Sequence, residues 1–149
     1  MEENYNYEAN GFLDPSVIFG ILLFFGAISL LAVIAQWRIF QKAGKPGWAS
    51  LVPLYNMYVH LKVVGKPGWW LLLLAVPLVN IYIAIKSVHL LSKSFGKDVG
   101  FTLGLLFLPM LFFPILAFGG ARYEGPYGDP DAFAAYQDKN RFEFEHAGY

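Results

Sequence analysis

The sequence predicts an all-α membrane protein of four hydrophobic helical segments, and three observations favour that class. The 149 residues are 56% hydrophobic, 18% aromatic and 15% charged, unlike an ordinary soluble domain. Nineteen consecutive residues, 17–35, carry no charge. The phrase Gly-Lys-Pro-Gly-Trp occurs at 44–48 and again at 65–69, each time before another apolar segment, so one supersecondary unit is used again.

The first segment is predicted over about residues 16–37. At about 1.5 Å per residue, its uncharged run is roughly 28 Å long, close to the bilayer core of about 30 Å. The acidic stretch 1–14 precedes it, and Arg38, Lys42 and Lys45 follow it. The positive-inside rule therefore predicts an extracytoplasmic N-terminus. Because the start lacks the basic residues of a secretory signal, we expect the segment to remain as an anchor.

Three further segments are predicted at about 48–64, 69–92 and 101–118, which together with the first form a membrane domain over residues 15–123. The second segment has only twelve residues before His60, a length more typical of a re-entrant or interfacial helix. The sequence thus predicts three or four crossings. Four are favoured, since a lysine near a segment end can extend its side chain to the interface.

The repeated phrase has the chemistry of a corner at the membrane surface. Its adjacent Pro and Gly favour a type II turn. Its Lys can reach lipid phosphate, and its Trp suits a position between hydrocarbon and water. A weaker third copy begins at Gly96. We therefore predict that five residues anchor the chain at the interface: Lys45, Trp48, Lys66, Trp69 and Lys97.

A second repeated pattern, Pro-Leu-x-Asn-x-Tyr, begins at Pro53 and Pro77, and the third copy has Pro109. A proline inside a helix removes one N–H and displaces the carbonyl four residues earlier, so the pattern predicts proline-kinked segments. A carbonyl freed in hydrocarbon needs an internal partner. The side-chain amides of Asn56 and Asn80 stand three residues after their prolines and can supply one.

Two interpretations of these asparagines remain open. In the first, Asn56 and Asn80 stabilise the kinks or join helices. In the second, they meet Tyr58 and Tyr82 near the midplane and form a binding site, as in transporters built from inverted repeats. The second interpretation requires an oligomer, because one short chain offers few walls for a pore.

The titratable residues do not form a catalytic or metal-binding pattern. Residues 15–123 hold nine basic residues and one acidic residue, Asp98. The basic residues stand singly at the ends of apolar runs, which favours membrane flanks over nucleic-acid binding. The chain has no cysteine, and His60 and His89 lack nearby carboxylates in sequence. We therefore expect no enzyme activity, no metal and no cofactor.

The polar tail, residues 124–149, is predicted to hold a short helix. Gly and Pro residues after position 118 indicate a loop. Asp129 then serves as N-cap with Pro130 at the first helical position, and the helix is expected to end near Asp138. Phe133 and Tyr136 lie three residues apart and can pack on the membrane domain or on a partner, and a frayed polar tail is the alternative.

The motifs KAGKPGW, PLYNMY, GKPGWWLLLLAVPLVN, SFGKDVGF and FPILAFG occur in this order. Between about residues 36 and 123, the chain resembles an uncharacterised bacterial family of small integral membrane proteins. Some members are named after signal peptidase I, because related domains can be joined to it. The resemblance implies a multi-helix domain in the inner membrane and an accessory relation to secretion or envelope proteins. The peptidase's Ser and Lys match no positions here.

The expected function is that of a non-enzymatic accessory or assembly subunit of the bacterial inner (cytoplasmic) membrane. Its expected partners are the lipid bilayer and either a membrane protein or further copies of the chain. The alternative is an oligomeric channel or transporter for ions or small solutes, with its site at the Pro-Asn pattern. An enzyme acting on lipid is a weaker third hypothesis, because no acids, bases or metal ligands cluster.

Overall fold

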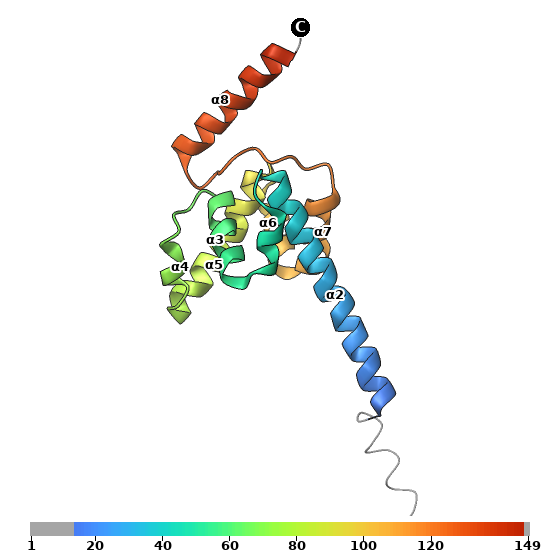
Figure 1. The fold of residues 1–149 in the computed structure, drawn as a ribbon. Helices are drawn as coiled ribbons and strands as arrows, with labels where there is room; N and C mark the ends of the chain where they lie inside the picture. The colour runs from blue at the N-terminus through green and yellow to red at the C-terminus, as the bar shows by residue number, and fades with distance from the viewer. Residues whose placement is uncertain (1–13, 148–149) are drawn as a thin grey trace, which may run out of the picture.

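The computed structural model describes residues 14–147, and over this range the regular secondary structure is entirely helical, without a β-strand (Figure 1). The acidic stretch 1–14 therefore lies, apart from Asp14, outside the described residues. The all-helical class is as predicted. In chain order the helices are α2 (Pro15–Lys42), the 3-10 helix η2 (Gly47–Leu51), α3 (Pro53–Val63), α4 (Trp70–Leu73), α5 (Pro77–Ser94), α6 (Val99–Phe107), α7 (Pro109–Phe118) and α8 (Pro130–Ala147).

Helix α2 contains the first predicted segment and continues beyond it to Lys42. The Asp14 side chain caps its start by accepting hydrogen bonds from the backbone N–H and the hydroxyl of Ser16, at 2.8 and 2.6 Å. Among the described residues, α2 alone has the length and apolar composition to cross a membrane. A signal sequence near an N-terminus has the same properties, so this helix by itself does not establish a multi-pass protein.

The three repeated prolines begin helices and do not kink them, which corrects the expectation of proline-kinked segments. Pro53, Pro77 and Pro109 are the first residues of α3, α5 and α7. A residue that precedes proline is pushed out of the α region, so the helix before it ends there. The backbone angles of these preceding residues are φ −106° and ψ 108° at Val52, φ −94° and ψ 114° at Val76, and φ −130° and ψ 54° at Leu108. Each apolar segment is therefore a short helix followed by a separate, longer one.

Helices α2, α3 and α5 end in the same backbone turn. Gly44, Gly65 and Gly96 have φ of 67°, 79° and 65°, a conformation that favours glycine. The N–H of the lysine after each glycine bonds to a carbonyl five residues earlier, which is the Schellman motif. These bonds are Lys45 to Phe40 at 2.8 Å, Lys66 to Leu61 at 2.8 Å and Lys97 to Ser92 at 2.9 Å.

The predicted type II turn is wrong, because it requires a positive φ at the second glycine of the phrase, and neither Gly47 nor Gly68 has one. These glycines instead allow close packing. A Cβ at Gly47 would overlap the ring of Trp37, and a Cβ at Gly68 would lie 2.7 Å from the ring of Tyr58. The aromatic residue stands ten positions before the glycine in both copies.

The segment between α7 and α8, residues 119–129, runs across the ends of the helices, and we call it the strap (Figure 1). It bonds to the last residues of α3 and α5. Tyr123 Oη donates to the Val63 carbonyl at 2.6 Å, and the Glu124 N–H donates to the Ser94 carbonyl at 2.7 Å. Lys42, at the end of α2, donates from Nζ to the Gly119 carbonyl at 2.9 Å. The ends of α2, α3 and α5 thus meet at one end of the molecule.

The predicted three or four crossings are not confirmed, because among the described residues α2 alone is a helix long and apolar enough to cross a membrane. Four successive crossings would place the ends of α2 and α3 on opposite faces of a bilayer, about 30 Å apart. The strap residues bonded to them, Gly119 and Tyr123, are four positions apart and so at most about 14 Å apart. Each of the three later apolar segments is interrupted at its proline, so none of them forms one continuous long helix.

The buried core lies directly beneath the strap. It combines the last turns of α2, α3, α5 and α7 with η2. Its fully buried large side chains include Ile39, Phe40, Leu91 and Leu116. Large apolar side chains on the first half of α2 are exposed, as are those at the far ends of the other helices.

Helix α8 begins at Pro130 as predicted, and the Asp129 carboxylate accepts from the Ala132 N–H at 3.2 Å. It continues to Ala147 and not only to about Asp138, since residues 131–147 contain no Gly or Pro. Phe133 and Tyr136 pack edge-on against the strap residues Tyr127 and Tyr123, with ring centroids 5.5 and 5.3 Å apart. The rest of α8 projects away from the helical body (Figure 1).

Candidate functional site

A small pocket between α3, α4 and α5, which we call the Asn pocket, brings together the two predicted asparagines. Its volume is about 190 Å³. The polar side chains in its wall are Asn56, His60, Asn80 and Ser87, and Met57, Leu61, Leu74, Ile83 and Ala84 complete it. Tyr58 and Tyr82 do not line it.

The two asparagines differ in their hydrogen bonds. Asn56 is half-buried, accepts from Gln36 Nε2 at 3.3 Å and donates from Nδ2 to the Ser50 carbonyl at 3.4 Å. Ser50 lies in η2, just before the break at Pro53, so Asn56 joins α2 to the interrupted part of its own segment. Asn80 is exposed, and within residues 14–147 its amide makes no side-chain hydrogen bond. It is therefore free for a ligand or a neighbouring chain.

Tyr58 and Tyr82 each pair with the lysine four residues later. Lys62 Nζ lies 5.5 Å from the ring centroid of Tyr58, and Lys86 Nζ lies 5.3 Å from that of Tyr82. Lys86 Nζ also donates to the Tyr82 hydroxyl at 3.0 Å. The structure therefore places these tyrosines with lysines on the outer faces of α3 and α5.

The predicted anchors all lie near the helix turns. Lys66 Nζ donates to the Gly128 carbonyl of the strap at 2.7 Å and lies 5.2 Å from the Trp70 ring. Lys97 lies 5.8 Å from the Phe101 ring. Trp48 stacks on Tyr55 with centroids 5.1 Å apart, whereas Trp69 meets Trp70 edge-on at 6.4 Å. Lys45 is exposed beside the strap.

Sequence reasoning missed Lys42 as a structural cation. Its Nζ donates to three carbonyls at the end of α7, those of Leu116, Gly119 and Ala121, at 2.7, 2.9 and 3.0 Å. A lysine in the last turn of a helix normally stabilises that helix. Here it stabilises another helix end more than seventy positions away, which no local pattern indicates.

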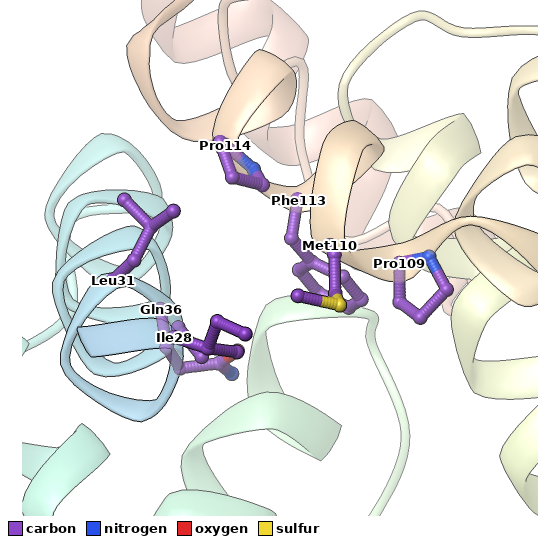
Figure 2. A pocket seen from close by; sticks show the side chains of 8 residues that line it. Ile28, Leu31, Gln36, Pro109, Met110, Phe113 and Pro114 are labelled. Atoms are coloured by element: carbon purple, nitrogen blue, oxygen red, sulfur yellow. The ribbon is translucent and has the colours of Figure 1, made fainter. Parts of the chain in front are cut away.

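An apolar groove of about 280 Å³ separates α2 from α7 (Figure 2). Ile28 and Leu31 of α2 face Met110 and Phe113 of α7 across it. Gln36 is the polar side chain at its inner end and hydrogen-bonds to Asn56. The groove suits an acyl chain or an apolar side chain by its composition.

A third cavity, the basic pocket, lies where the strap and α8 meet the ends of α2 and α3. It has a volume of about 380 Å³. Its lining residues are Ala43, Lys45, Lys62, Tyr123, Pro126, Ala132, Ala135, Tyr136 and Lys139. Burial raises the pKa of the Tyr123 phenol above its usual value, and Tyr136 adds to the shift, so the hydroxyl stays protonated and donates to Val63.

The remaining chemistry-bearing side chains are dispersed. His89 Nδ1 lies 3.2 Å from the Thr102 hydroxyl, while His60 lines the Asn pocket. Within the described range, no group of three or more His, Asp or Glu side chains has the spacing to hold a metal ion. The arrangement offers binding surfaces at three places: the Asn pocket, the apolar groove and the basic pocket.

Comparison with known proteins identifies a family whose function is not known. Residues 48–126 match the model of a family described as a family of unknown function, DUF5684. No curated protein and no solved structure matches the chain. The matched region spans η2 to α7 and the strap as far as Pro126, so it contains all three repeated prolines and omits α2 and α8.

Proposed function

The chain belongs to the DUF5684 family of unknown function, and from that premise we propose that it is a non-enzymatic integral membrane protein that acts as an accessory or assembly subunit. It does so by packing against another membrane protein. The observation that carries this proposal is the exposed apolar surface of α2. Phe19, Leu22 and Phe24 are 62%, 65% and 63% exposed, in a helix whose most apolar window has no buried residue.

The proposed membrane arrangement has one crossing and three re-entrant units. Helix α2 crosses, and each later unit enters beside the strap, turns at its proline break and returns to the strap. The basic residues then gather on one side, which the positive-inside rule assigns to the cytoplasm of a bacterial cell. These residues are Arg38, Lys42, Lys45, Lys62, Lys66, Lys93, Lys97 and Arg122.

Lys86 supports a partner on the outer face of α5. It lies eight residues before Ser94, or about 12 Å below the strap end of this helix. A cation at such a depth is costly against lipid alone and usually faces a polar group or a neighbouring protein. Lys86 and the Tyr82 hydroxyl that it contacts make the outer side of α5 the more polar of the two proposed contact faces, and α2 the apolar one. The resemblance seen in the sequence adds a relation to secretion or envelope proteins.

A photocrosslinking experiment tests the proposal. The residue p-benzoylphenylalanine replaces Phe24, which is exposed on α2, or Phe40, which is fully buried, in the chain expressed in its native membrane. We expect discrete protein adducts from position 24 and none from position 40. An adduct of twice the chain mass identifies a homo-oligomer, and another mass identifies a different subunit. Lipid adducts alone at position 24, with a monomer in several mild detergents, would contradict the proposal.

A second candidate function is an oligomeric path for ions or small solutes. The Asn pocket favours it, since Asn56 and Asn80 come from different repeats and line one cavity. We expect measurable flux in proteoliposomes that changes in Asn80→Leu, because this amide has the fewest structural contacts. Ile85→Leu, on the exposed side of the same helix, is the matched control. Absence of flux for ions and common metabolites removes this candidate.

A further inference from the structure

The basic pocket gathers lysines from three separate parts of the chain. Lys45 comes from the turn after α2, Lys62 from the last turn of α3 and Lys139 from the second half of α8. Docking of α8 on the strap, through the Tyr136 and Tyr123 rings, brings Lys139 to the other two. The cavity therefore depends on the tertiary fold and is not visible in any one segment.

No carboxylate lines this cavity. The strap's Glu124 points elsewhere, because its carboxyl group occupies the space where a Cβ at Gly96 would lie. Within residues 14–147 the one salt bridge joins Arg141 to Asp138 on α8. Three lysine residues that line one concavity without a counter-charge create a positive local potential, and their mutual repulsion is relieved when an anion enters.

We propose that the basic pocket binds a phosphate group of net negative charge, carried by an acidic lipid headgroup or by a soluble phosphate compound. Lysine is a compact cation that binds phosphate as a point charge. The Tyr136 side chain in the same wall adds a hydroxyl donor. A volume of about 380 Å³ holds a phosphate together with a small polar substituent.

The position of the pocket suits a headgroup. It opens beside the strap, at the end of the molecule where the turns after α2 and α3 meet. Lys62 is held near the pocket by the ring of Tyr58, 5.5 Å from its Nζ. The site goes beyond the proposed function, because phosphate can bind there whether or not α2 contacts a partner.

Calorimetric titration of the full chain in a neutral detergent tests the site. The probes are dihexanoyl phosphatidylglycerol, dihexanoyl phosphatidylcholine and inorganic phosphate. Each of Lys45→Gln, Lys62→Gln and Lys139→Gln is expected to weaken binding of the anionic probe about fivefold, and all three together about a hundredfold. Lys93→Gln, in the last turn of α5 and outside the pocket, should change it less than twofold. Lys62→Arg should restore most of the affinity.

The probes separate the two sources of phosphate. Saturable binding of phosphatidylglycerol that inorganic phosphate does not displace indicates a lipid site. Displacement by inorganic phosphate at similar concentrations indicates a soluble ligand. Equal binding of phosphatidylcholine, or an equal loss in Lys93→Gln, overturns the proposal. Unchanged melting temperatures of the single variants exclude misfolding as the cause of weaker binding. The crosslinks at position 24 test the proposed function separately, because they do not depend on phosphate binding.

Discussion

The hydroxyl group of Tyr123 donates a hydrogen bond of 2.6 Å to the carbonyl oxygen of Val63, sixty positions earlier in the chain. Val63 is the last residue of α3, where helical carbonyls have no partner within the helix. The bond therefore satisfies a helix end and fixes the strap over the core at the same time. The half-buried phenol ring also packs edge-on against Phe95, with centroids 5.4 Å apart.

Tyr123→Phe is expected to lower the free energy of unfolding by about 1 to 2 kcal/mol, because the Val63 carbonyl loses its partner while the ring stays in place. Thermal unfolding in detergent measures the change. Tyr127→Phe is the matched control, since Tyr127 lies in the same strap, is 46% exposed, and its hydroxyl donates no bond within the described residues. Equal melting temperatures for Tyr123→Phe and the control would show that the bond does not hold the strap.

The same phenol makes stability depend on alkaline pH. Burial raises the pKa of Tyr123 in the folded chain above its unfolded value of about 10. The folded state therefore holds this proton more tightly, so the contribution is complete below about pH 10 and is lost as the pH rises further. We expect the stability difference between wild type and Tyr123→Phe to shrink above pH 10, as measured by unfolding at pH 8, 10 and 11. A difference that stays constant contradicts this linkage.

The local sequence pattern predicted the helices whose position depends on neighbouring residues. The uncharged run 17–35 predicted α2, and Asp129 with Pro130 predicted where α8 begins. The prolines were predicted to kink continuous helices, whereas in the structure each one begins a new helix. The preceding residues, such as Val52 and Val76, were free to leave the α region, so a clean break cost less than a kink.

The shared helix end could not be predicted, because it depends on contacts between distant residues. The strap bonds Tyr123 to Val63 and Glu124 to Ser94, and neither pair has a pattern that joins its members. Asn56 and Asn80 do line one pocket, which lies between α3, α4 and α5.

Gly65→Ala should destabilise the protein more than Gly44→Ala, although both glycines end a helix in the same turn. Each has a positive φ, 79° and 67°, which costs about 1 to 2 kcal/mol for alanine. A Cβ at Gly65 would also lie 2.6 Å from the Pro126 carbonyl oxygen and 2.7 Å from the Asp129 nitrogen, whereas Gly44 faces open space.

Limited proteolysis within the strap, together with thermal unfolding, measures this extra cost. We expect Gly65→Ala to unfold at the lower temperature and to be cut faster between residues 119 and 129. Identical behaviour of the two variants would mean that the strap does not press on this turn.

Lys42→Met should cost about 2 kcal/mol or more, because three carbonyls at the end of α7 lose a charged donor. Methionine keeps the length and the apolar stem, so the loss reports on the ammonium group. Lys93→Met, in the last turn of α5, removes a charge that forms no ion pair within the described range and should change stability by less than about 0.5 kcal/mol. Chemical denaturation measures the free energy of unfolding of both variants. An equal loss of stability in the two would mean that net charge, and not the three hydrogen bonds of Lys42, causes the change.

Single cysteines at the three helix turns decide the membrane arrangement, and the chain has no native cysteine to interfere. Lys45→Cys, Lys66→Cys and Lys97→Cys follow α2, α3 and α5, whose ends the strap holds together. We expect that a membrane-impermeant maleimide labels none of the three cysteines in intact cells and labels all three after the inner membrane is opened. With four crossings Lys66→Cys would instead be labelled from outside while the other two were protected. If Lys66→Cys alone reacts in intact cells, the strap has not gathered these turns on one side of the bilayer. The proposed re-entrant units would then fail together with the cytoplasmic placement of the basic pocket, whose lysines belong to the same end.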